Sequence, residues 1–125
     1  MSHNVARSVS VALAICSFSS SGAGNVDFSF INGDFTPSIS TSVITLEAGF
    51  EYFIISSPVI SASTGYYHIV DGVNDPNYSV STTATTSGRD ERTSSIQADA
   101  SVTFSIYASQ ALGSNSRLQI WRFPL

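Results

Sequence analysis

Histidine, aspartate and serine are the side chains of this chain whose types could form a catalytic centre. His68 falls inside a predicted strand, and Asp71 and Asp75 follow it closely, while His3 lies near a terminus. A Ser–His–Asp hydrolase needs such a histidine as general base and such a carboxylate to orient it. Serine is so frequent here that one nearby carries no information, and no Gly-x-Ser-x-Gly turn is present. We therefore expect a protein that is not an enzyme, in which His68 is structural or lies at an interface.

Oxygen ligands are concentrated in segment 71–77, which reads Asp-Gly-Val-Asn-Asp-Pro-Asn. Carboxylate and carbonyl oxygens are the ligands that Ca²⁺ prefers. The spacing does not match an EF-hand, however, and the same residue types are the usual formers of turns. The single Cys16 excludes an intrachain disulfide and a cysteine-only metal cluster, and its apolar neighbours indicate a small buried side chain. We expect a turn at 71–77, no metal and no cofactor.

Tyrosines gather in and after the middle of the chain, at Tyr66, Tyr67 and Tyr78. Flat rings suit the faces of sugars, and tyrosine is common at interfaces. The alternative is ordinary packing within strands. Together with the loop 61–67, these tyrosines are the first candidates for a ligand-binding surface.

Charged residues form one cluster, Arg89-Asp90-Glu91-Arg92. The cluster lies between runs rich in Ser and Thr, and its opposite charges compensate one another. We expect an exposed loop within 82–93, in which Arg89 and Arg92 are the candidates for contact with a partner or a ligand.

Low charge is the main feature of the composition of this 125-residue chain. Asp, Glu, Lys and Arg make up 11% of the residues, lysine is absent, and Ser and Thr fill the polar positions. A surface of hydroxyls and apolar atoms is poorly protected against association, which indicates a protein that works inside an assembly. The net charge of −4 and the scattered arginines argue against a nucleic-acid partner. No segment is long enough to cross a membrane as a helix.

Near the N-terminus, Arg7 precedes a short apolar run at 9–16. This pattern is similar to a secretory signal, but the run is short and serines interrupt it. We expect no cleaved signal, and we expect residues 1–20 to form an arm or a first strand involved in assembly contacts.

Alternation of apolar and polar residues recurs along the chain, between clusters of turn residues, and no window shows helical spacing. The runs predicted to be strands lie at about 5–15, 26–30, 43–46, 50–57, 66–70, 78–86, 101–109 and 117–123. Many short strands with turns between them predict an all-β protein. We expect a single domain over 1–125, an antiparallel β-sandwich of the jelly-roll type.

Two of these runs are apolar on both faces. The run 52–55 has no polar face, and in the last run Leu118 and Ile120 alternate with Trp121 and Phe123. A strand of a two-sheet sandwich has one face in the core and one toward solvent, so a second apolar face needs a second burial partner, either another subunit or a covering loop. The residues expected at a subunit interface are Tyr52, Phe53, Ile55, Tyr107, Trp121 and Phe123.

Three segments resemble a known fold. Segment 44–52, Ile-Thr-Leu-Glu-Ala-Gly-Phe-Glu-Tyr, is similar to a recurring hairpin of the tumour necrosis factor and complement globular-head superfamily, in the form found on bacteriophage virions. Segments 102–107 and 116–121 resemble its penultimate and last strands. The resemblance implies a homotrimer around a threefold axis and a location in a virion.

Three functions follow as hypotheses. The first is a trimeric capsid decoration or cement protein that clamps the major capsid protein on the exterior of the head, because the strand pattern starts almost at the N-terminus and leaves no stalk. The second is a knob of a tail fibre or tail tip that binds a host-surface glycan through loops on a rigid sandwich. The third, an enzyme centred on His68, is the least supported.

Overall fold

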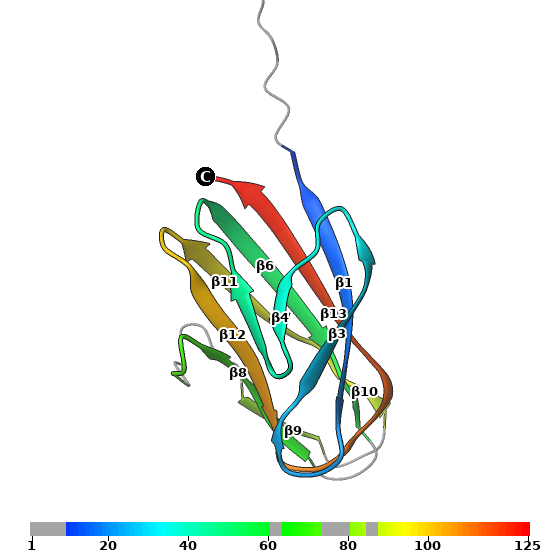
Figure 1. The fold of residues 1–125 in the computed structure, drawn as a ribbon. Helices are drawn as coiled ribbons and strands as arrows, with labels where there is room; N and C mark the ends of the chain where they lie inside the picture. Colours follow the sequence, from blue (N-terminus) through cyan, green and yellow to red (C-terminus); the bar gives the residue numbers. More distant parts are fainter. Residues whose placement is uncertain (1–9, 61–63, 74–80, 85–87) are drawn as a thin grey trace, which may run out of the picture.

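Two antiparallel β-sheets packed face to face make up the molecule (Figure 1). The computed structural model describes residues 10–60, 64–73, 81–84 and 88–125, and these contain strands but no helix. Accordingly, no helix in this described part could span a membrane. The expectation of an all-β antiparallel sandwich is confirmed.

Sheet A has the strand order β11–β6–β13–β1–β3, and the short β7 and β10 continue it beside the start of β13. Its strands are β1 (Ala12–Ser20), β3 (Asp27–Gly33), β6 (Phe50–Ser57), β7 (Val59–Ile60), β10 (Gly88–Arg89), β11 (Arg92–Ala98) and β13 (Leu112–Pro124). The last strand of the chain, β13, therefore lies in the middle of sheet A, between β6 and β1.

Sheet B has the order β4–β5–β12–β8–β9, with β2 also pairing with β12. Its strands are β2 (Gly24–Asn25), β4 (Ser38–Ser40), β5 (Val43–Leu46), β8 (Thr64–Val70), β9 (Ser81–Ala84) and β12 (Val102–Ala108). Strand β9 falls within the strand predicted at 78–86 and lies at the edge of its sheet.

The core lies between the two sheets. Phe104 and Ile106 of β12 and Leu118 and Ile120 of β13 are fully buried there, as the alternation in both runs predicts. Burying one such side chain contributes about 1.5–3 kcal/mol. The same alternation directs every second residue of these strands away from the core.

Strand β11 was not predicted, and the assignment of 82–93 to one loop is wrong, because β9 and β10 overlap this range and β11 begins at Arg92. Ser94, Ile96 and Ala98 alternate into the core, and β11 pairs with β6 along its whole length. Polar residues at most other positions hide the alternation, because Ile96 is the one large apolar residue of the strand.

The turn predicted after Val70 is present. Asp71 and Gly72 both have positive φ, at 51° and 73°, and the backbones of Val70 and Val73 exchange two hydrogen bonds. Positive φ at both central positions is the geometry that Asp-Gly favours in a two-residue hairpin. The remainder of the predicted segment 71–77 lies outside the described residues.

Candidate functional site

The outer face of sheet A carries a row of apolar side chains across its three central strands. Leu13 of β1 lies opposite Trp121 of β13, which lies opposite Phe53 of β6. Residues that pair directly across antiparallel strands share one face of the sheet. A second row on the same face places Ile15 opposite Gln119 and Gln119 opposite Ile55.

We call this surface the apolar stripe. It consists of Leu13, Ile15, Phe53, Ile55, Trp121 and Phe123. The indole nitrogen of Trp121 donates a hydrogen bond of 2.9 Å to Oε1 of Gln119 on its own strand. The stripe thus satisfies its one aromatic N–H internally and presents apolar surface outward.

The first half of strand β1 has small residues inside and larger aliphatic residues outside, and Phe18 continues the inner face. Ala14 and Cys16 are fully buried in the core, whereas Leu13 and Ile15 are half-buried on the outer face. An antiparallel sheet with one solvated face normally shows the opposite pattern, with polar residues outward. The sequence therefore makes this face suitable for burial against something outside the sandwich.

Exposure of single residues leads to the same conclusion. Phe53 retains 37% of its accessible surface and Val11, just before β1, retains 46%. Contiguous exposed apolar surface on a soluble domain marks an interaction site or a liability to aggregate. The other residues of the apolar stripe are half-buried.

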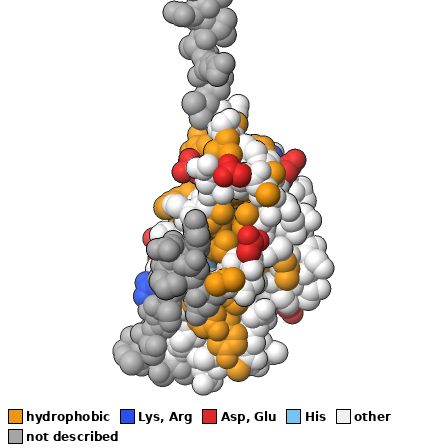
Figure 2. Space-filling model, turned by 90° about the vertical axis from the view of Figure 1, so that its left-hand side faces the viewer, with side chains coloured by type: hydrophobic (Ala, Val, Ile, Leu, Met, Phe, Trp, Pro, Cys, Tyr) orange, Lys and Arg blue, Asp and Glu red, His pale blue; other side chains and the backbone are white. Residues whose placement is uncertain are grey.

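Charged side chains are also sparse elsewhere on the surface, so they protect it little against association. Figure 2 shows one side of it, on which hydrophobic side chains form a vertical band and only a few acidic and basic groups are scattered. This agrees with the low fraction of charged residues in the sequence.

The predicted interface set divides between three places. Phe53, Ile55, Trp121 and Phe123 lie together in the apolar stripe. Tyr52 does not, because the alternation of β6 turns it into the core, where it is 1% exposed and its hydroxyl donates to the carbonyl of Glu47. Its assignment to the interface is corrected.

Tyr107 also lies away from the stripe, on β12 in sheet B. Its ring stacks on that of Tyr67, with centroids 5.1 Å apart and an angle of 22° between the planes. Tyr107 therefore lies on another sheet than Phe53, and its place at an interface stays a prediction. Leu13 and Ile15 were missed, although the sequence groups them on one face, because size alone would assign that face to the core.

The predicted tyrosine surface is not formed as a unit. Tyr66 points into the core with no exposed surface, and burial raises the pKa of its hydroxyl. Tyr67 lies on the opposite face of β8, which the strand alternation requires. Tyr78 lies outside the described residues, as do 61–63 of the predicted loop 61–67. Tyr66 is thus withdrawn as a ligand residue.

The two arginines of the charge cluster are both engaged. Arg89 donates to the carbonyl of Ser57 at 2.9 Å and to that of Asn115 at 3.0 Å. Arg92 forms an ion pair with Asp90 at 3.2 Å, so the expected compensation within the cluster is confirmed. Arg89 thus ties the end of β6 to β13, whereas the ion pair of Arg92 lies within its own segment.

His68 connects the two sheets inside the core. Its Nε2 is 2.6 Å from the hydroxyl of Ser56 on β6, and its Nδ1 is 2.7 Å from that of Ser94 on β11. Burial, and secondarily the charge of Arg92, lowers the pKa of His68 to about 4, so the ring is neutral at pH 7. One ring nitrogen then donates a hydrogen bond and the other accepts one.

This arrangement does not form the triad that His68 and Asp71 suggested. Both ring nitrogens face hydroxyls, His68 has no exposed surface, and a carboxylate oxygen of Asp71 accepts a hydrogen bond from the backbone N–H of Thr103. Asp75 lies outside the described residues. The geometry makes His68 a structural connection between the sheets.

Metal-ligating side chains do not cluster in the described part of the chain: no group of three or more His, Cys, Asp or Glu residues could hold an ion there. Cys16 is buried, and desolvation raises the pKa of its thiol to about 11. The prediction of a small buried cysteine is confirmed.

Comparisons with known proteins identify the fold. No protein-family model matches the sequence, and no curated protein matches it. The crystal structure of murine APRIL at pH 8.5 superposes with a TM-score of 0.62 at 10% sequence identity, over 90% of this chain and 99% of that one. APRIL has a jelly roll of the tumour necrosis factor type. The present chain therefore has a jelly-roll fold similar to that of tumour necrosis factor.

Proposed function

We propose that this chain is a non-enzymatic structural protein of a virion, and that it acts as a homotrimer whose subunits pack through the apolar stripe. The observation that carries the assembly is the paired row of Leu13, Trp121 and Phe53 on the outside of sheet A. A soluble domain that stayed alone would expose this row to water.

Three copies are favoured over two by the resemblance to the tumour necrosis factor and complement globular-head superfamily, which implies a threefold arrangement. In such an arrangement each subunit offers two different surfaces to its neighbours, and the ring closes on itself. The stripe spans β6, β13 and β1, the three central strands of sheet A, so a large part of this face would be buried.

A location on the exterior of a capsid, in contact with the major capsid protein, fits the surface chemistry. Residues of low charge, rich in Ser and Thr, suit permanent contact with other virion proteins better than free diffusion. A trimer also multiplies each weak contact with the coat by its valency, which lengthens residence without new chemistry. The protein would then decorate the particle or cement neighbouring coat subunits.

Antibody-gold labelling of intact particles tests the location. Decoration of the capsid predicts gold over the whole head in electron micrographs, and removal of the protein should then weaken the particle against heat. Gold confined to the tail would contradict capsid decoration and favour a knob that binds a host-surface glycan. Particles without gold would reject the virion assignment.

A further inference from the structure

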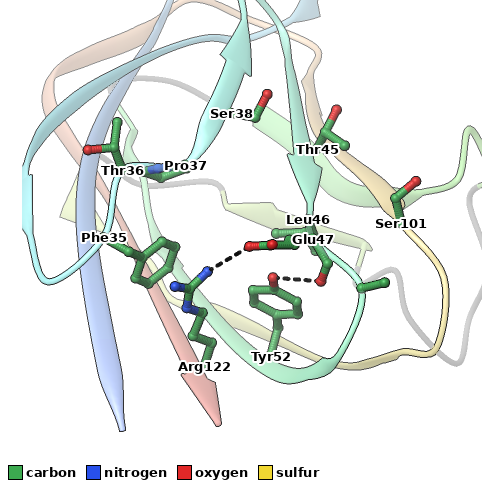
Figure 3. Close-up of a pocket in the computed structure, with 11 residues that line it drawn as sticks. Phe35, Thr36, Pro37, Ser38, Thr45, Leu46, Glu47, Tyr52, Ser101 and Arg122 are labelled. Atoms are coloured by element: carbon green, nitrogen blue, oxygen red, sulfur yellow. Dashed lines mark hydrogen bonds and ion pairs between the residues drawn. The ribbon is translucent and has the colours of Figure 1, made fainter. Parts of the chain in front are cut away.

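A cavity opens at one end of the sandwich, where segments of both sheets meet. Its volume is about 380 Å³, which lies within the range of small-molecule sites. Figure 3 shows that its walls come from distant parts of the chain: the segment before β4, the end of β5 with the turn that follows, β6, the turn before β12, and β13. Among the described residues that line it, Arg122 is the one basic side chain.

Arg122 is held in place by two aromatic rings. Its guanidinium carbon lies 3.9 Å from the centroid of Phe35 and 4.1 Å from that of Phe50. The two cation–π contacts fix the position of the guanidinium, while its N–H groups face the side chains of Glu47 and Tyr52. The cation is therefore pre-positioned in the cavity by groups that do not neutralise its charge.

The one anionic partner of Arg122 is weakly placed. A carboxylate oxygen of Glu47 lies 3.5 Å from a terminal nitrogen of Arg122, longer than an ordinary charge-assisted hydrogen bond. The side chain of Glu47 is 72% exposed, so water screens this pair. The buried Nε of Arg122 has no hydrogen-bond acceptor within the described residues.

We propose that this cavity binds a compact carboxylate, specifically the carboxylate of an acidic sugar, with Arg122 as its receptor. Glu47 occupies the position of that carboxylate when no ligand is present. Because Glu47 sits on an exposed turn, it can move away when an external carboxylate replaces it. Arg is well suited to such a site because its planar edge matches the two oxygens of a carboxylate.

The remaining lining favours a sugar as the body of the ligand. Both hydroxyl-bearing and apolar side chains line the cavity. The hydroxyl-bearing residues are Thr36, Ser38, Thr45 and Ser101, and the apolar ones include Phe35, Pro37 and Leu46. Hydroxyls that both donate and accept match the hydroxyls of a pyranose ring, whereas an aliphatic acid would leave them without ligand partners.

The proposal does not depend on the trimer. Arg122 and Glu47 lie at the end of the sandwich, while the apolar stripe lies on the outer face of sheet A. Ligand binding and trimer formation can therefore be tested separately, and either one can be disproved without the other.

Nuclear magnetic resonance titration of the full chain tests it, with four probes: glucuronate, N-acetylneuraminate, glucose and hexanoate. We expect the two acidic sugars to shift the resonances of the cavity residues saturably, and glucose to do so at least about tenfold more weakly. Absence of saturable shifts with either acidic sugar overturns the proposal. Equal binding of glucose, or tighter binding of hexanoate, also overturns it.

Variants of the ion pair sharpen the test because the two partners should act in opposite directions. Arg122→Gln should weaken binding of the acidic sugar by about tenfold or more, since a charge-assisted contact is lost. Glu47→Gln should tighten binding several-fold, because it removes the internal competitor. Glu91→Gln is the control, because it changes the net charge equally. Glu91 directly precedes β11, at the end of that strand away from the cavity, so this variant should leave the affinity for the acidic sugar unchanged.

The Glu47→Gln result keeps the proposal testable if Arg122→Gln fails to fold. Weaker or unchanged binding in Glu47→Gln, or equal effects of Glu47→Gln and Glu91→Gln, would contradict the assignment of Glu47 as the internal competitor and of Arg122 as the receptor.

Discussion

The outer faces of the two sheets differ in what they offer to another molecule. On sheet A, Leu13, Trp121 and Phe53 form one apolar row. On sheet B, Thr45 pairs with Thr103, and Ser105 pairs with Ile69, so hydroxyls alternate with apolar groups. Both sheets bury an apolar inner face, so the fold of the single chain does not explain the difference. The proposed assembly through sheet A would explain it.

The largest expected effect comes from a matched pair of substitutions. Ile55 on sheet A and Ile69 on sheet B are both half-buried on outer faces of interior strands. Ile55→Asp should convert the trimer to monomers or aggregates, because an unpaired carboxylate buried at the interface costs several kcal/mol. Ile69→Asp should leave a trimer. Size-exclusion chromatography with light scattering distinguishes them.

Phe53→Asp and Trp121→Asp should behave as Ile55→Asp does, since both side chains belong to the apolar stripe. A native trimer from Ile55→Asp, Phe53→Asp and Trp121→Asp alike would show that the stripe is not the interface.

A second pair of substitutions compares the two faces of sheet A. Leu118 points into the core, where Leu→Ala removes about 2–5 kcal/mol from the free energy of unfolding. Leu118→Ala should therefore lower the urea midpoint at every protein concentration. Leu13→Ala should lower it mainly at concentrations where the trimer forms. Equal, concentration-independent shifts would place Leu13 in the monomer's own core.

The buried His68 that connects the two sheets should make the free energy of unfolding depend on pH. Because the pKa of folded His68 is about 4 and that of an unfolded histidine is about 6.5, the unfolded chain binds more protons between these values. Stability is complete above pH 6.5 and falls as the pH drops toward 4, by about 3 kcal/mol in total. Urea denaturation at several pH values measures this loss.

Substitution separates His68 from the other histidine. His68→Gln should remove the loss of stability between pH 6.5 and 4, while His3→Gln should retain it. A pH profile that is the same in all three proteins would contradict the buried neutral ring.

The smallest effect concerns thiol chemistry on strand β1. Cys16 is fully buried, and its thiol has a pKa raised to about 11, so it should resist a thiol reagent at pH 8 until the chain unfolds. The double variant Cys16→Ala, Ser19→Cys places a thiol at an exposed position of the same strand, where it should react at once. Rapid labelling of native Cys16 would contradict its place in the core.

The sandwich itself was predictable because most strands alternate clearly. The two apolar faces of the last strand also indicated an external burial partner before any geometry was known. The orientation of Tyr52 was not predictable, because both faces of the run 52–55 are apolar and hydrophobicity alone cannot choose between them. Tyr52 turns inward, where its hydroxyl reaches the carbonyl of Glu47.

Contacts between distant parts of the chain also could not be predicted from the sequence. The hydroxyls beside His68 come from β6 and β11, 12 and 26 residues away. The cavity at the end of the sandwich brings Phe35, Glu47 and Arg122 together only because β13 lies in the middle of sheet A. No local pattern in the sequence encodes such a juxtaposition.

Sedimentation equilibrium of the native protein at micromolar concentration tests the central claim most directly. Packing through the apolar stripe predicts a species of three times the chain mass of 13.3 kDa, persistent on dilution. A single species of 13.3 kDa over the whole concentration range, with the apolar stripe accessible to solvent, would contradict assembly through sheet A.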